Sequence, residues 1–557
     1  MRTDDSYRSI GRVTSMTADT FMIELHHRLN HFTTVGFDDI HYLARIGSFV
    51  MIPLLSDYIV TEIVELWEKD PTNRSPIQEE NTYKFTKTSS TKYLKVVPLG
   101  TLPKNSKKEF CSGISAFPSL YTEALYVLDE ELDRIFNVKD EKEDKENGQQ
   151  EGSKKEEQKK YITIGRSTVF QKYDIKIRLD DYFGGHSAIL GNTGSGKSCT
   201  MAAVLQSLFE KEPQNATFII FDVHGEYKQA FSAHSYKRIT RDHKDQGDDI
   251  FTLPPSFLSF EEWVSLLRPS PQSQKPALER ALEKLNPELF CDVGMLQTTI
   301  QELTDNKNRP LLPYNGQNKD FYTRLRNIQT SSNFSFLRKN ENLSQNNKEE
   351  YITGLLDFEP KNTGDKKQHQ IIILDLQEAS DEALGLISAV LARLVFEWIR
   401  NSDKKERFPI HFILDEAHRY IPEKFSFNFN NDNSPQGTHI HTYDTLERLA
   451  KEGRKYGIFL QLISQRPSEL SKTVLSQCSN FIIHKIQNPD DLRYIRQMTP
   501  YISESITKRL PSLPQRHALV FGNAINLPVT AEMREADPST ASDDVKVSEK
   551  WFKEKEE

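Results

Sequence analysis

The sequence predicts an α/β fold in which a mostly parallel β-sheet is covered by helices and preceded by a small β-barrel. In the later two-thirds of the 557-residue chain, continuous apolar runs alternate with amphipathic helical segments, which is typical of buried parallel strands. The first hundred residues instead carry short alternating runs broken by turn residues, a pattern that favours a barrel. A stretch of almost wholly charged and polar residues separates the two regions.

The barrel is predicted within residues 1–136. Its strand-like runs include Thr20–Leu25, Phe49–Pro53 and Tyr93–Val97. Residues 137–160 follow, and from Lys139 onward they contain no apolar side chain that could anchor a core. We therefore predict a disordered linker there, with an isolated charged helix as the alternative.

The α/β domain is predicted to span residues 161–530, with residues 531–557 as a C-terminal tail. Its strand-like runs are Tyr161–Ile164, Ser187–Leu190, Thr217–Phe221, Ile371–Leu376, Ile410–Leu414, Ile458–Ile463, Phe481–Ile483 and Ala518–Phe521. Helical patterns interrupt the alternation between about residues 253 and 348, at Phe260–Leu267, Pro276–Leu285 and Met295–Leu303. This predicts a helical insertion that ends in an Asn- and Ser-rich loop near residues 331–347.

The composition indicates a reduced, cytoplasmic protein. The four cysteines, at positions 111, 199, 291 and 478, are scattered without metal-binding spacing and predict no disulfide framework. The N-terminus lacks an apolar secretion signal, and the longest apolar segments, such as 386–399, are short and carry charge, so no membrane span is expected. The net charge of −8 argues weakly against a surface that coats nucleic acid. Tyr236–Lys244 is a local basic stretch, for which a solvated surface loop is at least as good an interpretation.

The most specific motif is the eight-residue sequence Gly-Asn-Thr-Gly-Ser-Gly-Lys-Ser, which directly follows the apolar run Ser187–Leu190. Glycines at these positions let consecutive backbone N–H groups turn inward around phosphates, and the following helix adds the positive end of its dipole. The motif therefore predicts a site for ATP, in which Lys197 reaches the β- and γ-phosphates and Ser198 holds Mg²⁺. The predicted nucleotide contacts are Gly191, Asn192, Thr193, Gly194, Ser195, Gly196, Lys197, Ser198 and Cys199.

A pair of carboxylates follows a second apolar run, Ile410–Leu414. Asp415, at the end of this run, is predicted to hold Mg²⁺ through water, and Glu416 to orient and deprotonate the water that attacks the γ-phosphate. An acidic pair that merely caps the next helix is the alternative. Together with the phosphate loop, the pair predicts hydrolysis of the nucleotide.

Two families of motor fit the sequence Asp-Glu-Ala-His at residues 415–418. The tetrapeptide alone resembles that of a DEAH-box helicase, but such proteins carry a second core domain with an arginine-rich Gln-x-x-Gly-Arg-x-x-Arg motif, which this sequence lacks. The chain after Glu416 is too short for a second motor domain. The other candidate rests on motifs further along the chain.

Those motifs resemble the HerA family, within the HerA/FtsK class of ring translocases. They are Asp222–Tyr227, Ala450–Ile458, Ser464–Ser468, Asn488–Asp491, Leu513–Pro514 and Ala518–Gly522. The opening β region also looks like the barrel of that family. One departure is Gln515–His517, where relatives tend to carry a Gly-Glu pair. The resemblance implies a RecA-like P-loop motor domain in a homohexamer that uses ATP and Mg²⁺ to move double-stranded DNA through its centre. A ring needs only a basic channel, so the acidic net charge is no obstacle.

The resemblance also suggests roles for two residues after the acidic pair. Arg454 would act as a finger that reaches the γ-phosphate held by a neighbouring subunit, a contribution of about 10³ to 10⁵ in rate in such motors. Gln465 would sense the γ-phosphate through a hydrogen bond. The alternatives are that Arg454 pairs with Glu452 or with a helix C-terminus, and that Gln465 is a satisfied amide at a strand end.

The family pattern implies a separate effector, either a NurA-like nuclease or a sirtuin-like NAD-degrading enzyme, in DNA-end processing or anti-phage defence. A scaffold ATPase that switches an effector without moving DNA is an alternative, and a VirB-like secretion ATPase is a third. His224, Glu226 and Tyr227 follow a core strand on the side where such sheets bind ligands, but capping is an equally good explanation. The loop Pro422–His441 is a candidate for the channel lining.

Overall fold

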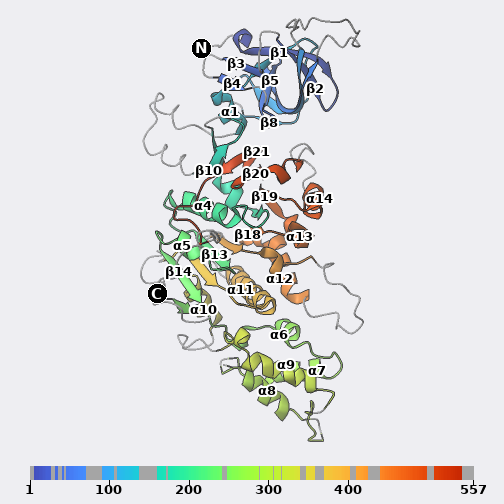
Figure 1. Ribbon diagram of the computed structural model, residues 1–557. Helices are drawn as coiled ribbons and strands as arrows, with labels where there is room; N and C mark the ends of the chain where they lie inside the picture. The colour runs from blue at the N-terminus through green and yellow to red at the C-terminus, as the bar shows by residue number, and fades with distance from the viewer. Residues whose placement is uncertain are drawn as a thin grey trace, which may run out of the picture. The chain divides into compact units, whose positions relative to one another are not determined.

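The computed structural model describes most of the chain, and its contacts divide it into two compact units (Figure 1). The described residues are 5–26, 32–35, 40–42, 45–69, 91–105, 109–136, 160–170, 173–240, 248–287, 289–290, 292–304, 307–314, 316–338, 347–357, 369–401, 409–423, 440–498 and 507–541. The first unit combines Met1–Leu179 with Tyr501–Ser512 and His517–Met533, and the second contains Asp180–Pro500, Leu513–Arg516 and Arg534–Glu557. The predicted linker and most of the loop Pro422–His441 lie outside the described residues.

The first unit contains the barrel that the sequence predicts. Its strands are β1 (Ser9–Met16), β2 (Phe21–Leu25), β5 (Phe49–Pro53), β6 (Asp57–Lys69), β7 (Thr91–Pro103) and β9 (Glu123–Tyr126). They are ordered β2-β1-β9-β5-β6-β7, and pairing of β2 with β7 closes the ring. Alternate residues such as Val13, Ile23 and Val96 face inward and are fully buried, which explains the alternating pattern in the sequence. The helix α1 (Asp129–Phe136) follows β9.

Four further strands of the first unit pair antiparallel. They are β10 (Tyr161–Ser167), β11 (Asp174–Arg178), β20 (His517–Gly522) and β21 (Ile525–Met533), in the order β11-β10-β21-β20. Parts of β10 and β20 were expected within a parallel sheet, whereas β11 and β21 were not expected. Only two residues separate β20 from β21. A connection this short can join two antiparallel strands but cannot join two parallel ones. Residues 531–533, expected in the tail, belong to β21.

Within its described residues, the second unit contains eight strands that pair in parallel, as expected for an α/β fold. Its strands are β12 (His186–Leu190), β13 (Thr217–Asp222), β14 (Tyr236–Thr240), β15 (Asp249–Ile250), β16 (Ile371–Asp375), β17 (Ile410–Leu414), β18 (Ile458–Ser464) and β19 (Cys478–Ile483). Their order is β19-β12-β18-β17-β13-β16-β14-β15, and all their pairings are parallel. The central strands are buried along their whole length because helices such as α4 (Lys197–Phe209), α11 (Asp381–Asn401) and α12 (Ile440–Glu452) flank them. Figure 1 shows α11 and α12 side by side.

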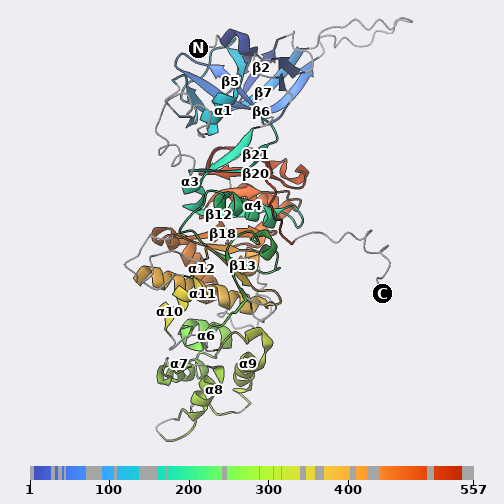
Figure 2. The same ribbon diagram turned by 90° about the vertical axis from the view of Figure 1, so that its left-hand side faces the viewer.

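Helices fill the region between β15 and β16. They are α6 (Phe260–Leu267), α7 (Gln274–Lys284), α8 (Val293–Glu302), α9 (Lys319–Thr330) and α10 (Lys348–Leu355), and Figure 2 shows α6 to α9 grouped together. The three helices predicted from periodicity are present within two residues of their expected ends. The prediction missed α9, although Phe321, Leu325 and Ile328 recur at helical spacing and are buried. No helix in the described part of the chain combines enough length with enough apolar character to cross a bilayer.

The basic stretch Tyr236–Lys244 is not a surface loop where the structure describes it. Residues 236–240 form β14, and Arg238 is largely buried. Its guanidinium lies 2.6 Å from Asp375 Oδ2 and 2.7 Å from Asp248 Oδ2. Arg238 is therefore a structural ion-pair residue of the sheet. Residues 241–247 lie outside the described chain.

We expect Arg238→Leu to lower the free energy of unfolding by about 3 to 5 kcal/mol, because it leaves two buried carboxylates without their cation. The measurement is denaturant unfolding followed by circular dichroism. Arg493→Leu is the matched control, since Arg493 and its partner Asp490 are both about 70% exposed and such pairs contribute about 0 to 1 kcal/mol. Equal losses in the two variants would contradict a structural role for the buried pair.

Candidate active site

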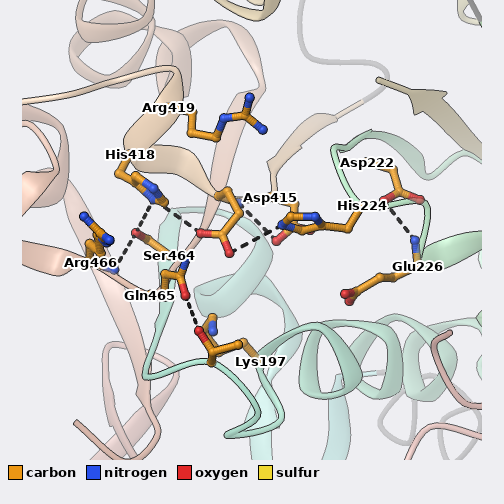
Figure 3. A network of polar contacts seen from close by, with 12 residues as sticks. Lys197, Asp222, His224, Glu226, Asp415, His418, Arg419, Ser464, Gln465 and Arg466 are labelled. Carbon is orange, nitrogen blue, oxygen red and sulfur yellow. Dashed lines mark hydrogen bonds and ion pairs between the residues drawn. The ribbon is translucent and has the colours of Figure 1, made fainter. Parts of the chain in front are cut away.

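The predicted phosphate loop, acidic pair and Gln465 meet at one edge of the parallel sheet. The loop follows β12, Asp415 follows β17 and Gln465 follows β18, and the carboxyl ends of these parallel strands share one edge. Figure 3 shows Lys197, Asp415 and Gln465 converging there. The register of the strands thus assembles the site from distant segments, since Lys197 precedes Asp415 by more than 200 residues.

The phosphate loop has the backbone that a polyphosphate site needs. Gly196 adopts φ +102°, a left-handed conformation that L-residues with side chains rarely accept, and Lys197 then begins α4. The first N–H groups of a helix have no partners within it and carry the positive end of its dipole. Lys197 Nζ donates to the carbonyl oxygen of Asn192 at 3.1 Å, so the ammonium group folds back over the loop. Cys199, in the first turn of α4, accepts a hydrogen bond from Ala536 N.

The departure from the family motif at Gln515–His517 has a structural counterpart. Gln515 Nε2 donates to Gly194 O at 3.0 Å, and Arg516 N donates to Ser195 O at 3.2 Å. Two residues from far along the chain therefore brace the phosphate loop. The sequence alone gave no signal for these contacts.

Negative charge concentrates beside Lys197. Asp415 is buried, and its Oδ2 has no hydrogen-bond donor among the described residues. Burial raises the pKa of Asp415 well above its usual range, and the nearby carboxylates of Glu416, Asp222 and Glu226 raise it further. Burial lowers the pKa of Lys197, while the charges of Glu416, Asp415 and Glu226 oppose that shift. This excess of carboxylates over cations, with an orphaned oxygen on Asp415, is the donor chemistry that Mg²⁺ prefers.

Glu416 is held in an unusual position between two histidines. Its backbone is left-handed, with φ +50°, and such outliers cluster at functional sites. Glu416 Oε1 lies 3.8 Å from His224 Nε2, and Oε2 lies 3.3 Å from His418 Nδ1. Burial raises the pKa of Glu416, but the neighbouring imidazole of His224 and the charges of His418 and Lys197 bring it below the ordinary value. Glu416 is therefore kept ionised, as a group that accepts a proton must be.

His224 and His418 were not among the predicted site residues. His224 lies beyond β13, where Asp222 accepts hydrogen bonds from the N–H groups of Gly225, Glu226 and Tyr227 and so fixes the turn. The residue that caps this turn is therefore Asp222, whereas His224 faces the catalytic edge of the sheet (Figure 3). Its place after a core strand was the available signal.

Gln465 contacts the phosphate loop directly. Its Oε1 accepts a hydrogen bond from the hydroxyl group of Thr193. The preceding residue, Ser464, lies 3.2 Å from His418 Nδ1 and accepts from Arg466 N at 3.1 Å. The tip of β18 therefore touches both the phosphate loop and the segment that carries Glu416.

Arg454 does not join this group. It lies in the short helix η8 (Gly453–Tyr456), ahead of β18, and is exposed. It is thus at the amino edge of the sheet, whereas the phosphate loop is at the carboxyl edge. The seven residues of β18 separate the two edges by about 20 Å at roughly 3.3 Å per residue. The alternative partner Glu452 lies 3.2 Å from Arg448 instead.

Comparison with known proteins relates this chain to one family. A family model described as the central domain of the helicase HerA matches residues 162–395, which include the phosphate loop. The DNA double-strand break repair helicase HerA of Sulfolobus acidocaldarius is 27% identical over 417 residues, covering 71% of this chain and 74% of that protein. HerA of Saccharolobus solfataricus is 26% identical over 405 residues, covering 70% of this chain and 72% of that protein. The solved structure of VirB4 of Thermoanaerobacter pseudethanolicus matches with a TM-score of 0.44 at 16% identity, covering 67% of this chain and 96% of that chain.

Proposed function

Because the chain belongs to the HerA family of ATPases, we propose that it is an ATP-hydrolysing ring motor that moves along double-stranded DNA. The observation that carries the enzymatic part is the convergence of Lys197 and Glu416 at one sheet edge around the buried, unsatisfied Asp415. The DNA substrate is inferred from the two relatives described above, both of which are named as DNA double-strand break repair helicases.

Each predicted residue then has a defined task in a RecA-like motor. The loop from Gly191 to Ser198 and the start of α4 bind the phosphates of ATP, with Lys197 neutralising the terminal ones. Ser198 and Asp415 are the residues that would hold Mg²⁺, which supplies further charge neutralisation when it is bound. Glu416, kept ionised by His224, accepts the proton of the attacking water. Gln465 reports the γ-phosphate to β18 through its bond with Thr193.

The position of Arg454 supports a shared site. An arginine at the amino edge cannot reach the γ-phosphate bound at the carboxyl edge of its own sheet. In a ring with repeated head-to-tail contacts, the amino edge of one subunit can face the carboxyl edge of the next. We therefore propose a homohexamer in which Arg454 completes the neighbour's active site.

The proposed partner is an effector encoded as a separate protein. A NurA-like nuclease would fit DNA-end processing, and a sirtuin-like NAD-degrading enzyme would fit anti-phage defence. The barrel is the candidate for docking that effector. A reduced cytoplasmic setting agrees with the scattered cysteines.

The test is ATP turnover by the purified protein with and without linear duplex DNA. We expect duplex to stimulate hydrolysis strongly, because a motor couples its turnover to its track. Heparin at matched charge is the control for nonspecific polyanion binding. Equal turnover with and without duplex would contradict translocation and favour a scaffold ATPase, and retention of the protein on inner-membrane vesicles would favour a VirB-like secretion ATPase.

A further inference from the structure

The turn that carries Arg454 is closely packed although Arg454 itself is exposed. Gly453 begins the turn, and a Cβ atom there would lie 2.8 Å from the carbonyl oxygen of Ile458, so only glycine permits this tight return of the chain. The ring of Tyr456 packs edge-on against Phe396 of α11, with centroids 5.0 Å apart. The arginine is therefore presented on a rigid support.

His186 fixes both ends of this turn. It is the first residue of β12, and only 3% of it is exposed. Its Nε2 lies 2.9 Å from the carbonyl oxygen of Ala450, at the end of α12. Its Nδ1 accepts a hydrogen bond of 2.9 Å from the N–H group of Leu460, in β18. The two partners flank Arg454 in sequence, so one imidazole joins the segment that enters the turn to the segment that leaves it.

The chemistry of the imidazole suits this role. Burial, with a smaller effect from the nearby charge of Arg454, lowers the pKa of His186 to about 4, although the hydrogen bond to the carbonyl oxygen of Ala450 opposes this shift. The ring is therefore neutral at physiological pH. A neutral imidazole has one donor and one acceptor, and here Nε2–H donates to Ala450 while Nδ1 accepts from Leu460. Both polar atoms of this buried ring are satisfied by the turn.

We propose that His186 is a positioning residue for Arg454, which ties the arginine-bearing turn to the strand that carries the phosphate loop. The inference rests on the proposed role of Arg454 as a finger for the neighbouring subunit. Preorganisation matters because a displacement of about 1 Å in a catalytic group can cost about 100-fold in rate. Since β12 ends at Leu190, directly before the phosphate loop, a single five-residue strand joins the ATP site of one subunit to the arginine that it offers to the next.

The first experiment replaces His186 by phenylalanine, which keeps a planar ring but loses both hydrogen bonds. We expect kcat for ATP to fall about 10- to 100-fold. The affinity for a nonhydrolysable ATP analogue should stay unchanged, because the finger belongs to another subunit's site. His186→Gln can restore the hydrogen-bond donor to the carbonyl oxygen of Ala450. Its kcat should lie between that of the wild type and that of His186→Phe. It also keeps the test decisive if the phenylalanine variant folds poorly.

A double-variant comparison separates positioning from general stability. If His186 acts through Arg454, adding His186→Phe to Arg454→Ala should slow turnover no further. His411→Phe is the matched control: this second buried histidine of the sheet stacks on Phe459 and lies 3.4 Å from Gln461, beyond the turn. We expect it to retain kcat within about twofold of the wild type.

Two results would overturn the role of His186 without affecting the proposed role of Arg454. One is an equal loss of kcat in His186→Phe and His411→Phe, and the other is a double variant slower than Arg454→Ala. In both cases Arg454→Ala would still be far slower than the wild type, and the finger would stand. Full activity of Arg454→Ala would be a different result from these two. It would show that Arg454 is not a finger, and the proposed role of His186 would then be lost as well.

Discussion

Glu416→Gln is expected to bind ATP with the affinity of the wild type and to hydrolyse it about 100 to 10,000 times more slowly. Glutamine keeps the size and shape of the side chain but cannot accept the proton of the attacking water. The contacts of the phosphate loop do not involve Glu416, so binding should persist. The measurements are kcat from phosphate release and Kd from a fluorescent ATP analogue.

A matched control separates this effect from a general response to lost charge. Glu283→Gln changes an exposed glutamate of α7 and should leave both quantities unchanged. Normal turnover by Glu416→Gln would show that another group takes the proton. A parallel loss of binding and turnover would instead mean that the residue supports the fold of the site.

The parallel sheet could be predicted because its strands are locally distinct. Ile410–Leu414 is a continuous apolar run that ends at two carboxylates, and β17 spans the same five residues. The phosphate loop was predictable for a similar reason, since its spacing encodes a backbone shape. Once the strands are known to be parallel, the meeting of Lys197 with Glu416 at one edge follows without further information.

Other parts of the fold depend on contacts that no local pattern contains. The guanidinium of Arg238 can lie largely buried in β14 because Asp375 and Asp248 neutralise it, and neither partner is adjacent in sequence. The antiparallel strand β21 includes Asn526 and Pro528, which weaken a strand pattern, yet it pairs with both β10 and β20. Such elements are stabilised by tertiary partners more than by their own propensity.

The same distinction applies to the site. Residue types alone suggested Lys197, Asp415 and Glu416, but the histidines beside Glu416 come from two different segments. The left-handed backbone of Glu416 also has no sequence signature, because glutamate rarely adopts it. Contacts between segments therefore decide which candidate groups touch, and for Arg454 they place the residue at the edge opposite the phosphate loop of its own sheet.

Arg454→Ala and Lys197→Ala should each abolish turnover alone and should recover part of it when their subunits are mixed. Loss of a finger costs about 10³ to 10⁵ in rate, and loss of Lys197 removes the ammonium group that neutralises the phosphates. In a mixed ring, an Arg454→Ala subunit supplies an intact Lys197, and a neighbouring Lys197→Ala subunit supplies an intact Arg454. Such a junction has both groups.

The size of the recovery tests the geometry. Random assembly of equal amounts gives intact groups at about a quarter of head-to-tail junctions, so mixed rings should reach up to about a quarter of the wild-type rate. Native mass spectrometry should confirm that the two variants share rings. If Arg454 served its own subunit, every subunit would still carry one lesion, and no ratio would restore turnover. The control is each variant assembled on its own at the same total protein concentration, and its rate of ATP turnover should stay at background.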